Sequence, residues 1–447
     1  MSNPGAADPT PIESTRQLAE WFAAGSKPRT AWTIGTEHEK FGFRRDTLAP
    51  PPYAPDGIEA MLHGIMARGW APIRDGAHVI GLTRDNASVS LEPGGQFELS
   101  GAPVATLHET REELAAHIRD VHEVGGPLGL GFAPLGFHPL ATREAMPWMP
   151  KSRYAIMRRY MPTRGTLGLD MMLRTCTVQV NLDFGDEADM AEKLRVSLAL
   201  QPLATALFAN SPFYEGKPSG RLSGRGHVWT DTDPDRTGIP ACVFEPGFGF
   251  ERFVEFVLDV PMYFVAREGK LIDAAGASFR DFMAGRLAAL PGERATMGDW
   301  ADHVTTVFTD VRLKRFLEMR GADAGSPAMM VAKSAFWVGL IYDDAAQKAA
   351  AAMVRDWSLA DIRTLRADAP IHGLRARIRG HSLQDIAKNT LAIARDGLRA
   401  RALGEEVYLA PLHEIADSGM TQADRALQLF GSAWAGNAGR FLTANEV

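Results

Sequence analysis

The sequence of 447 residues predicts an α+β fold, with a sheet in the first part of the chain and helices around it. Segments whose residues alternate between apolar and polar fall within residues 14–325, where helical segments separate them. In residues 326–447, Ala, Leu, Arg and Asp dominate and β-branched residues become scarce, a composition that favours helices. No clear linker divides the two parts, so we expect the helical part to pack on the sheet-based core within one domain.

Helices are predicted where apolar residues recur three and four positions apart. In chain order these segments are residues 15–24, 58–68, 107–124 and 188–208. Gly25 ends the first of them. Further along, Ser382-Leu-Gln-Asp385 and Thr421-Gln-Ala-Asp424 have the spacing of helix N-terminal caps, with Asp in the place of the usual Glu.

Strands are predicted where polar and apolar residues alternate, or where β-branched and aromatic residues gather. These segments are residues 30–43, two short strands within 87–99, residues 173–184 and residues 316–320. The turn Pro93-Gly94-Gly95 separates the two short strands. Residues 50–55 are expected to form a loop, and residues 251–264 a strand or a mixed segment.

Composition and charge exclude several classes of protein. The chain has 48 Lys and Arg residues against 54 Asp and Glu residues, and the net charge of −6 argues against a general nucleic-acid-binding protein. Its two cysteines, Cys176 and Cys242, cannot form a disulfide framework or a four-cysteine zinc site. We therefore expect reduced chemistry and a cytoplasmic location.

The chain shows no membrane segment. Residues 1–13 lack the apolar core of a signal peptide, and we expect them to form a short disordered tail. The best membrane candidate, residues 198–209, is too short to span a bilayer and contains Gln201 and Pro202. We expect a buried helix there and no contact with a membrane.

Four segments direct polar side chains to one side of a predicted strand, because residues i and i+2 of a strand share a face. The sets are Glu37 with Glu39; Gln96 with Glu98, after Glu92 and the glycine turn; Thr177, Gln179, Asn181 and Asp183; and Glu318 with Arg320. One interpretation is that these are solvent-exposed faces of an antiparallel sheet. Against it, the faces carry Glu and Gln beside glycines, in segments otherwise rich in Phe, Leu and Val.

If these faces converge, their charges need cations. Two carboxylates about 4 Å apart repel by about 4 kcal/mol at an effective dielectric constant near 20. Clustered carboxylates without a His/Cys set favour Mg²⁺ or Mn²⁺ over zinc, and Mg²⁺ with open positions is typical of sites that use ATP. No G-x-x-x-x-G-K-[ST] sequence is present. The pattern therefore predicts a nucleotide- and metal-dependent enzyme without a P-loop.

Seven segments resemble those of glutamate–cysteine ligases of the plant and proteobacterial type, and they occur in the same order over nearly the whole chain. They are IGTEHEKFGF (34–43), LEPGGQFELS (91–100), MLRTCTVQVNLDF (172–184), FANSPF (208–213), WTDTDPDRTG (229–238), LDVPMYF (258–264) and RLKRFLEMRGAD (312–323). The resemblance implies a fold of the glutamine-synthetase-like superfamily, in which a curved antiparallel sheet wrapped by helices forms a funnel-shaped active site. It also implies the first step of glutathione synthesis: ATP phosphorylates the γ-carboxylate of L-glutamate, and the amine of L-cysteine attacks the γ-glutamyl phosphate.

The same resemblance implies roles for individual residues. The divalent ions, Mg²⁺ or Mn²⁺, would be held by Glu37, Glu39, Glu92, Glu98, Glu318 and Gln179. Arg320 would stabilise the transferring phosphoryl group, because a planar guanidinium fits phosphate. Glutamate would be bound by Arg153, Arg225 and Tyr263.

Each of these roles has a structural alternative. Glu92 could cap the turn, and Arg320 could form a surface ion pair with Glu318. Arg153 and Arg225 could be ordinary surface arginines. Tyr263 could belong to the core. Trp229 and Met171 could shape the cysteine pocket, although core packing is the simpler role for both.

The other reactive side chains are expected to be structural. His38 points away from Glu37 and Glu39 in a regular strand, and Cys176, on the apolar face of its strand, is expected to be a buried thiol. Plant members of the family carry additional redox-sensitive cysteines, which would fall near Ala274, Ala289 and Val331. None of these is cysteine, so disulfide control is not expected, and the lack of a transit peptide argues against a plastid copy.

Three alternatives to this function remain open, together with the oligomeric state, monomer or homodimer. The enzyme could join glutamate to a different amine, because acceptor choice depends on a few pocket contacts. It could be a binding or regulatory relative without activity, although every expected metal carboxylate is present. It could also be a phosphotransferase that makes the acyl phosphate and transfers the group elsewhere.

Overall fold

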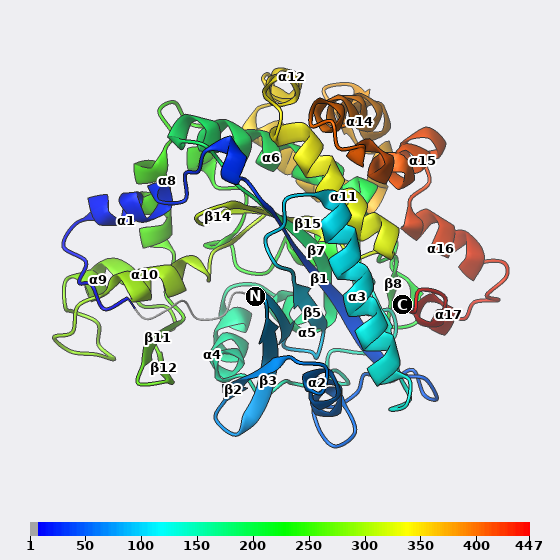
Figure 1. Ribbon diagram of the computed structural model, residues 1–447, viewed down its shortest axis with the longest axis horizontal. Helices are drawn as coiled ribbons and strands as arrows, with labels where there is room; N and C mark the ends of the chain where they lie inside the picture. The colour runs from blue at the N-terminus through cyan, green and yellow to red at the C-terminus, as the bar shows by residue number, and fades with distance from the viewer. Residues whose placement is uncertain (1–7) are drawn as a thin grey trace.

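The computed structural model describes residues 8–447, which build one large open sheet flanked by helices (Figure 1). Nine strands form the sheet in the order β14-β15-β7-β1-β5-β4-β3-β2, with β6 also paired to β1, and every pair is antiparallel. The strands are β1 (Ile34–Arg44), β2 (Ala71–Asp75), β3 (His78–Arg84), β4 (Ala87–Leu91), β5 (Phe97–Ser100), β6 (Leu130–Ala133), β7 (Thr177–Leu182), β14 (Val311–Leu313) and β15 (Leu317–Asp323). The predicted α+β class with an antiparallel sheet is confirmed.

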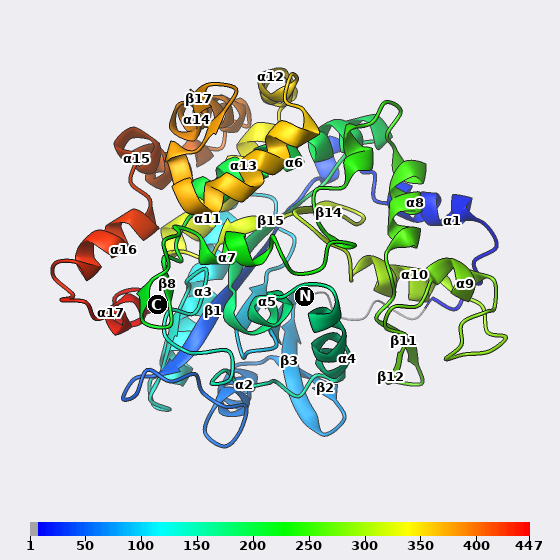
Figure 2. The same cartoon turned by 180° about the vertical axis from the view of Figure 1, so that it is seen from behind.

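Helices cover one face of this sheet. Helix α11 (Pro327–Ile341) packs on β7 and β1, α3 (Leu107–Gly125) on β1 and β6, and α6 (Glu187–Leu207) on β15 and β14. Apolar side chains of β7, such as Val178 and Val180, are buried beneath them. Figure 1 shows α3 and α11 in front of β1, and Figure 2, from behind, shows α5 (Gly168–Arg174) and α7 (Gly224–Val228) on the opposite side.

The remaining elements surround this core. The other α-helices are α1 (Thr15–Ala23), α2 (Ile58–Met66), α4 (Ser152–Tyr160), α8 (Phe250–Asp259), α9 (Phe279–Met283), α10 (Met297–Val304), α12 (Asp344–Val354), α13 (Leu359–His372), α14 (Leu383–Ala400), α15 (Ala410–Ser418), α16 (Gln422–Phe430) and α17 (Gly439–Ala444). Short strand pairs are β8 (Phe213–Tyr214) with β9 (Lys217–Pro218), β10 (Thr237–Gly238) with β13 (Phe308–Thr309), β11 (Phe264–Arg267) with β12 (Lys270–Asp273), and β16 (Arg377–Ile378) with β17 (His381–Ser382).

Most elements predicted from the sequence are confirmed. The four predicted helices correspond to α1, α2, α3 and α6. The two predicted caps are also present: the hydroxyls of Ser382 and Thr421 accept the backbone N–H groups of Asp385 and Asp424. Helix α11 begins directly after β15 and packs on the sheet, and the division into a core of residues 14–325 and a helical region of residues 326–447 stays a prediction.

Three expectations differ from the structure. Residues 251–264, expected to form a strand or a mixed segment, are mostly helical: α8 covers 250–259, because Phe250, Phe253 and Val257 recur at helical spacing and pack in the core, and a strand begins only at residue 264. Strand β7 begins only at Thr177, since the residues before it form α5. Residues 1–7 of the expected tail lie outside the described residues. Residues 8–13 are held in place, because Ile12 is buried and its N–H donates to the carbonyl of Ala295 at 3.1 Å.

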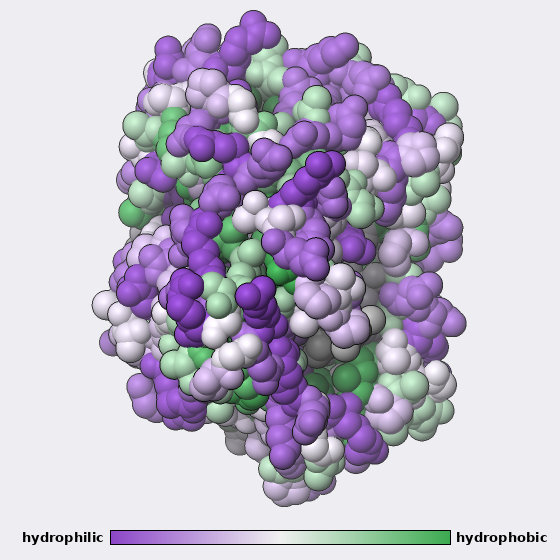
Figure 3. Space-filling model, turned by 90° about the vertical axis from the view of Figure 1, so that its left-hand side faces the viewer, coloured by the Kyte–Doolittle hydropathy of each residue, from purple (hydrophilic) through white to green (hydrophobic). Residues whose placement is uncertain are grey.

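The surface is mainly hydrophilic where Figure 3 shows it, on the side that carries α1 and α9, and apolar side chains form only small groups there. No helix in the described part of the chain is long and apolar enough to cross a membrane.

Candidate active site

Strand register brings the predicted acidic residues to one face of the sheet. In the pairing of β1 with β5, Glu39 lies opposite Glu98; in the pairing with β7, Glu37 lies opposite Gln179. In the next strand pair, Glu318 of β15 lies opposite Asn181 of β7. Because opposite residues of antiparallel strands project from the same side, the four polar faces converge as their periodicity predicts.

These carboxylates do not belong to a solvent-exposed face. Glu98 and Glu318 are 0% exposed, and Glu37, Glu39 and Glu92 are each 8% exposed. Helices α5 and α7 lie over this side of the sheet, as Figure 2 shows. The alternative of an ordinary solvated sheet face is therefore excluded.

Neutral hydrogen-bond donors hold several of the carboxylates. The side-chain amides of Gln179 and Asn181 donate to the two oxygens of Glu37 at 3.0 and 2.9 Å. The backbone N–H of Thr177 donates to Glu39 at 2.9 Å. The hydroxyl of Ser90 donates to Glu98 at 2.7 Å. Such bonds fix the orientation of each carboxylate without neutralising its charge.

Burial and mutual repulsion disfavour the ionised forms of three carboxyls. Burial, followed by the charges of neighbouring carboxylates, raises the pKa of Glu37 and raises that of Glu39 well above its usual value. Burial likewise raises the pKa of Glu92 to about 7, and the charge of Glu98 adds to this effect. A bound cation would relieve this unfavourable crowding.

Glu318 has a different environment. Its carboxylate contacts the guanidinium groups of Arg312 at 2.8 Å and Arg320 at 2.6 Å, and the ammonium group of Lys314 at 3.3 Å. Although burial opposes ionisation, these cations hold the pKa of Glu318 well below its usual value. The ion pair between Arg320 and Glu318 expected as an alternative is present, but it is buried rather than on the surface. Glu318 is thus a counter-ion of three cations.

Part of the predicted set meets in one cavity above the sheet, whereas Glu37, Glu98 and Glu318 are not among its lining residues. Glu39, Glu92, Gln179, Arg225 and Arg320 line it. The wall is completed by Trp229, Phe308, Met171 and the neighbouring methionines. Trp229 and Met171 therefore contribute to the site and not only to the core. The guanidinium carbons of Arg225 and Arg320 lie 5.8 and 5.9 Å from the Trp229 ring centroid.

Two of the residues predicted to bind glutamate lie elsewhere. Tyr263 is 1% exposed and does not line this cavity; its hydroxyl donates to the sulfur of Met161 at 3.5 Å, and the guanidinium of Arg236 stacks on its ring. Arg153 lines an adjacent cavity over the ring of Phe264. Its Nε and Nη2 atoms are buried and have no hydrogen-bond partner within residues 8–447. Tyr263 therefore occupies a core position, which is the alternative role expected for it above. Arg153 has donor atoms that remain available to bind an anion.

Sequence reasoning missed several residues of the site. Arg312 and Lys314 neutralise Glu318, and Phe308 forms part of the wall. The alternation of polar and apolar residues along 177–183 does indicate Asn181 as a site residue, because Asn181 shares a strand face with Gln179. On the opposite face of β1, His38 contacts the ring of His117 and the ammonium of Lys40, as expected for a structural residue. Cys176 is a buried free thiol, also as expected.

The described residues form no preassembled metal cage. Among residues 8–447, no group of three or more His, Cys, Asp or Glu side chains lies close enough to hold an ion. Mg²⁺ rarely uses such a cage, since it is usually bound by one or two carboxylates, waters and substrate phosphates. The donor set consists of oxygens, and the buried side-chain carbonyl oxygens of Gln179 and Asn181 have no hydrogen-bond partner in the described chain. These residues fit a hard divalent cation.

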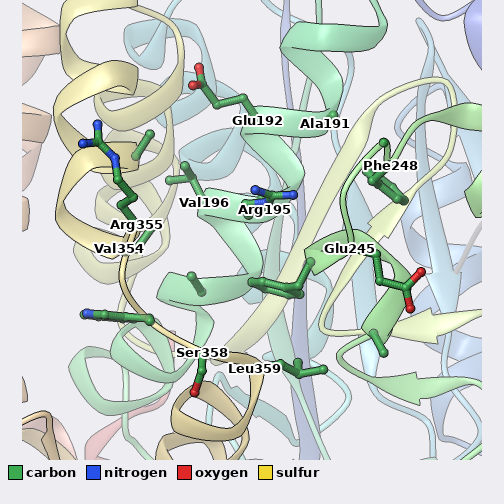
Figure 4. A pocket seen from close by; sticks show the side chains of 16 residues that line it. Ala191, Glu192, Arg195, Val196, Glu245, Phe248, Val354, Arg355, Ser358 and Leu359 are labelled. Carbon is green, nitrogen blue, oxygen red and sulfur yellow. The ribbon is translucent and has the colours of Figure 1, made fainter.

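A larger cavity contributes none of these residues. It measures about 680 Å³ and lies between α6, the loop after residue 241 and the junction of α12 with α13 (Figure 4). Apolar side chains such as Val196 and Phe248 line it, together with Arg195 and Arg355. The smaller carboxylate-lined cavity is the candidate active site, because chemistry depends on the groups present and not on size.

Comparisons with known proteins show the family of the chain. The model of glutamate-cysteine ligase family 2 matches residues 33–444. The chain belongs to this family. It is 50% identical over 420 residues to the chloroplastic glutamate–cysteine ligase of Medicago truncatula, covering 94% of this chain and 82% of the relative. It is 51% identical over 418 residues to the corresponding enzyme of Arabidopsis thaliana, covering 93% and 80%.

A solved structure supports the fold. The glutamate–cysteine ligase of Francisella tularensis, in complex with AMP, superposes with a TM-score of 0.56 at 12% identity, covering 93% of this chain and 87% of the other. As a glutamate–cysteine ligase family member, this enzyme forms γ-glutamylcysteine from glutamate and cysteine in an ATP-dependent reaction, the first step of glutathione synthesis.

The expected cytoplasmic location is corrected by the same comparisons. The relatives from Medicago truncatula, Arabidopsis thaliana and Oryza sativa are chloroplastic, and this finding overturns the cytoplasmic expectation. Cysteine content separates oxidising from reducing compartments only, so it was no basis for choosing between these two locations.

Proposed function

We propose that this ligase activates glutamate in the cavity lined by the carboxylates of Glu39 and Glu92 and by the guanidinium of Arg320. An oxygen of the glutamate γ-carboxylate attacks the terminal phosphorus of ATP, and ADP leaves. The amine of cysteine then attacks the acyl carbon, and phosphate leaves with the electron pair of the C–O bond. One observation supports this proposal: buried acidic residues line the same cavity as Arg225 and Arg320.

The acidic side of the cavity is the proposed position of Mg²⁺ or Mn²⁺. Glu37, Glu39, Glu92 and Glu98 would hold the ions, and the amide oxygen of Gln179 would complete the set. When bound, the cation neutralises charge on the phosphates of ATP. Glu318 was expected to be a further ligand, but its three cationic partners favour a role as the anchor of Arg320.

Arg320 is the proposed catalytic residue. Its Nη1 donates to Glu318 at 2.6 Å, which leaves the remaining donors of a planar fork for the cavity. A guanidinium fixed before the reaction stabilises charge that develops on the transferring phosphoryl group without reorganising. Burial of the ion pair excludes water and strengthens this interaction.

Two arginines are proposed to bind glutamate. Arg225 is 4% exposed, and its Nη2 donates to the carbonyl oxygen of Arg320 at 2.8 Å. Its position beside Arg320 suits a substrate carboxylate that must lie close to the transferring group. The unsatisfied buried donors of Arg153, in the adjacent cavity, suit a second anionic group of a substrate. Tyr263 is not part of this proposal.

One assay tests the function. Purified protein is incubated with MgATP and glutamate, then with cysteine or other amines, and both ADP and the peptide product are followed. We expect γ-glutamylcysteine with cysteine, and no turnover when the metal is chelated. Faster product formation with another amine would move the assignment to a different acceptor. ADP formation without any peptide would indicate a phosphotransferase, and no turnover in any mixture would indicate a binding protein.

A further inference from the structure

Strand β15 is interrupted at the position of the proposed catalytic arginine. Its register with β7 shifts between Met319 and Ala322, so Arg320 and Gly321 form a bulge that is not paired with β7. Bulges bend a strand and change the direction of a side chain, and they are common beside active sites. A buried backbone group requires a hydrogen-bond partner. The backbone groups of the bulge must therefore find partners outside the backbone ladder that joins β15 to β7.

Two side chains of helix α6 supply those partners. The Oε1 atom of Gln201 accepts the N–H of Gly321 at 3.0 Å, and the hydroxyl of Thr205 donates to the carbonyl oxygen of Gly321 at 2.8 Å. Gln201 is 1% exposed within a helix whose other residues are mainly apolar. The approach is close, because a Cβ atom at position 321 would lie 2.0 Å from Oε1 of Gln201 and would force the amide side chain to move.

The backbone of Arg320 connects this bulge to the rest of the active site. Its N–H donates to the carbonyl oxygen of Asp310 at 3.1 Å. Its carbonyl oxygen accepts from Nη2 of Arg225 at 2.8 Å and from the hydroxyl of Thr177 at 3.1 Å. The position of the bulge thus determines where both cavity arginines lie.

We infer that Gln201 and Thr205 are positioning residues: they hold the bulge of β15 so that the guanidinium groups of Arg320 and Arg225 are aligned in the cavity. This inference rests on the role proposed for Arg320. Neither side chain of α6 needs to touch a reacting atom, since both act through the backbone of Gly321. A displacement of about 1 Å in a catalytic group can reduce a rate by about 100-fold, so the geometry of the bulge controls turnover.

The first test removes one hydroxyl with a matched set of variants. Thr205→Val preserves shape but loses the bond to Gly321, whereas Thr205→Ser keeps it. Ser197→Ala, about two turns earlier in α6, is the control, because the hydroxyl of Ser197 is buried without a hydrogen-bond partner within residues 8–447. We expect Thr205→Val to lower kcat by roughly 10-fold or more. Thr205→Ser and Ser197→Ala should keep kcat within about 2-fold at an unchanged melting temperature.

The second test asks whether the effect passes through Arg320. In a double-mutant cycle, Thr205→Val should cause no further loss of kcat in the background of Arg320→Lys. Gln201→Met, which loses the acceptor of the Gly321 N–H group, serves as a second variant if Thr205→Val folds poorly. An additive loss, or equal kcat for Thr205→Val and Ser197→Ala, overturns the inference. If Arg320→Lys itself keeps full activity, the proposed role of Arg320 fails instead, so the two failures are distinguishable.

Discussion

Glu39 and Glu98 lie directly opposite one another on the neighbouring strands β1 and β5, and both are buried. Opposed residues on antiparallel strands have Cβ atoms about 4.5–5.5 Å apart, and like charges in such a pair are destabilising. The fold of this chain nevertheless places the pair at the centre of the sheet. The arrangement is explained if a divalent cation, present during turnover, compensates the two charges.

The metal site predicts opposite effects of one substitution on activity and stability. Glu39→Gln removes a ligand, so we expect kcat to fall by roughly 100-fold or more, which corresponds to about 2.7 kcal/mol in the barrier. It also removes a buried charge, so the melting temperature of the metal-free protein should rise. Turnover and thermal unfolding, each with and without chelator, measure both effects. Glu112→Gln, on the exposed surface, is the matched control. A lower melting temperature without metal would contradict the account.

We expect Glu318→Gln to have the opposite effect on stability and to destabilise the metal-free protein. Removing this carboxylate leaves the buried guanidinium of Arg312 and its neighbours without a counter-charge, and such uncompensated burial costs about 3–5 kcal/mol. We expect a clear loss of unfolding free energy in urea, in the presence or absence of magnesium. If Glu318→Gln instead stabilised the metal-free protein as Glu39→Gln should, Glu318 would belong with the metal ligands.

Stability should depend on pH through Glu92. Its pKa is raised from 4.5 to about 7 in the folded protein, so between these values the folded state binds a proton that the unfolded state has lost. The free energy of unfolding therefore falls as pH rises from about 4.5 to 7, by an upper limit of about 3 kcal/mol for this group. Urea unfolding of metal-free protein across this range measures the slope. Glu92→Gln should reduce it, and an unchanged slope would show that other groups determine it.

Glutamate affinity should depend on Arg225 and not on Tyr263. Arg225→Lys loses the planar fork, so we expect the KM for glutamate to rise by roughly 10-fold to 100-fold. Tyr263→Phe removes only a hydroxyl that is bonded to the sulfur of Met161, so it should leave this KM within about 2-fold. Steady-state kinetics with varied glutamate distinguish the two. A large increase in KM for Tyr263→Phe would restore the role first expected of this residue.

The local periodicity of the sequence was sufficient for the strand faces. Alternation alone placed Glu37 and Glu39 together, and it placed His38 on the opposite side. For residues 251–264 a strand or a mixed segment was expected, but residues 250–259 form a helix. The helical spacing of their apolar residues is the signal that would have predicted it.

Contacts between distant segments were beyond sequence reasoning. Arg312 and Glu318 are opposite one another only because the β14–β15 hairpin has its particular register. Tyr263 was expected in the glutamate pocket because its segment resembles the family, but resemblance does not specify which way a side chain points. Similarly, no local pattern indicates that Gln201 of α6 reaches the bulge of β15.

Strand β1 carries acids on one side and His38 and Lys40 on the other, where helix α3 covers them. A shift of one residue exchanges the two sides of a strand. One inserted or deleted residue before Glu37 would therefore drive the acids into the helix-covered interior and turn the imidazole and ammonium groups toward the cavity. The length of this segment is therefore as constrained as the identity of its acidic residues.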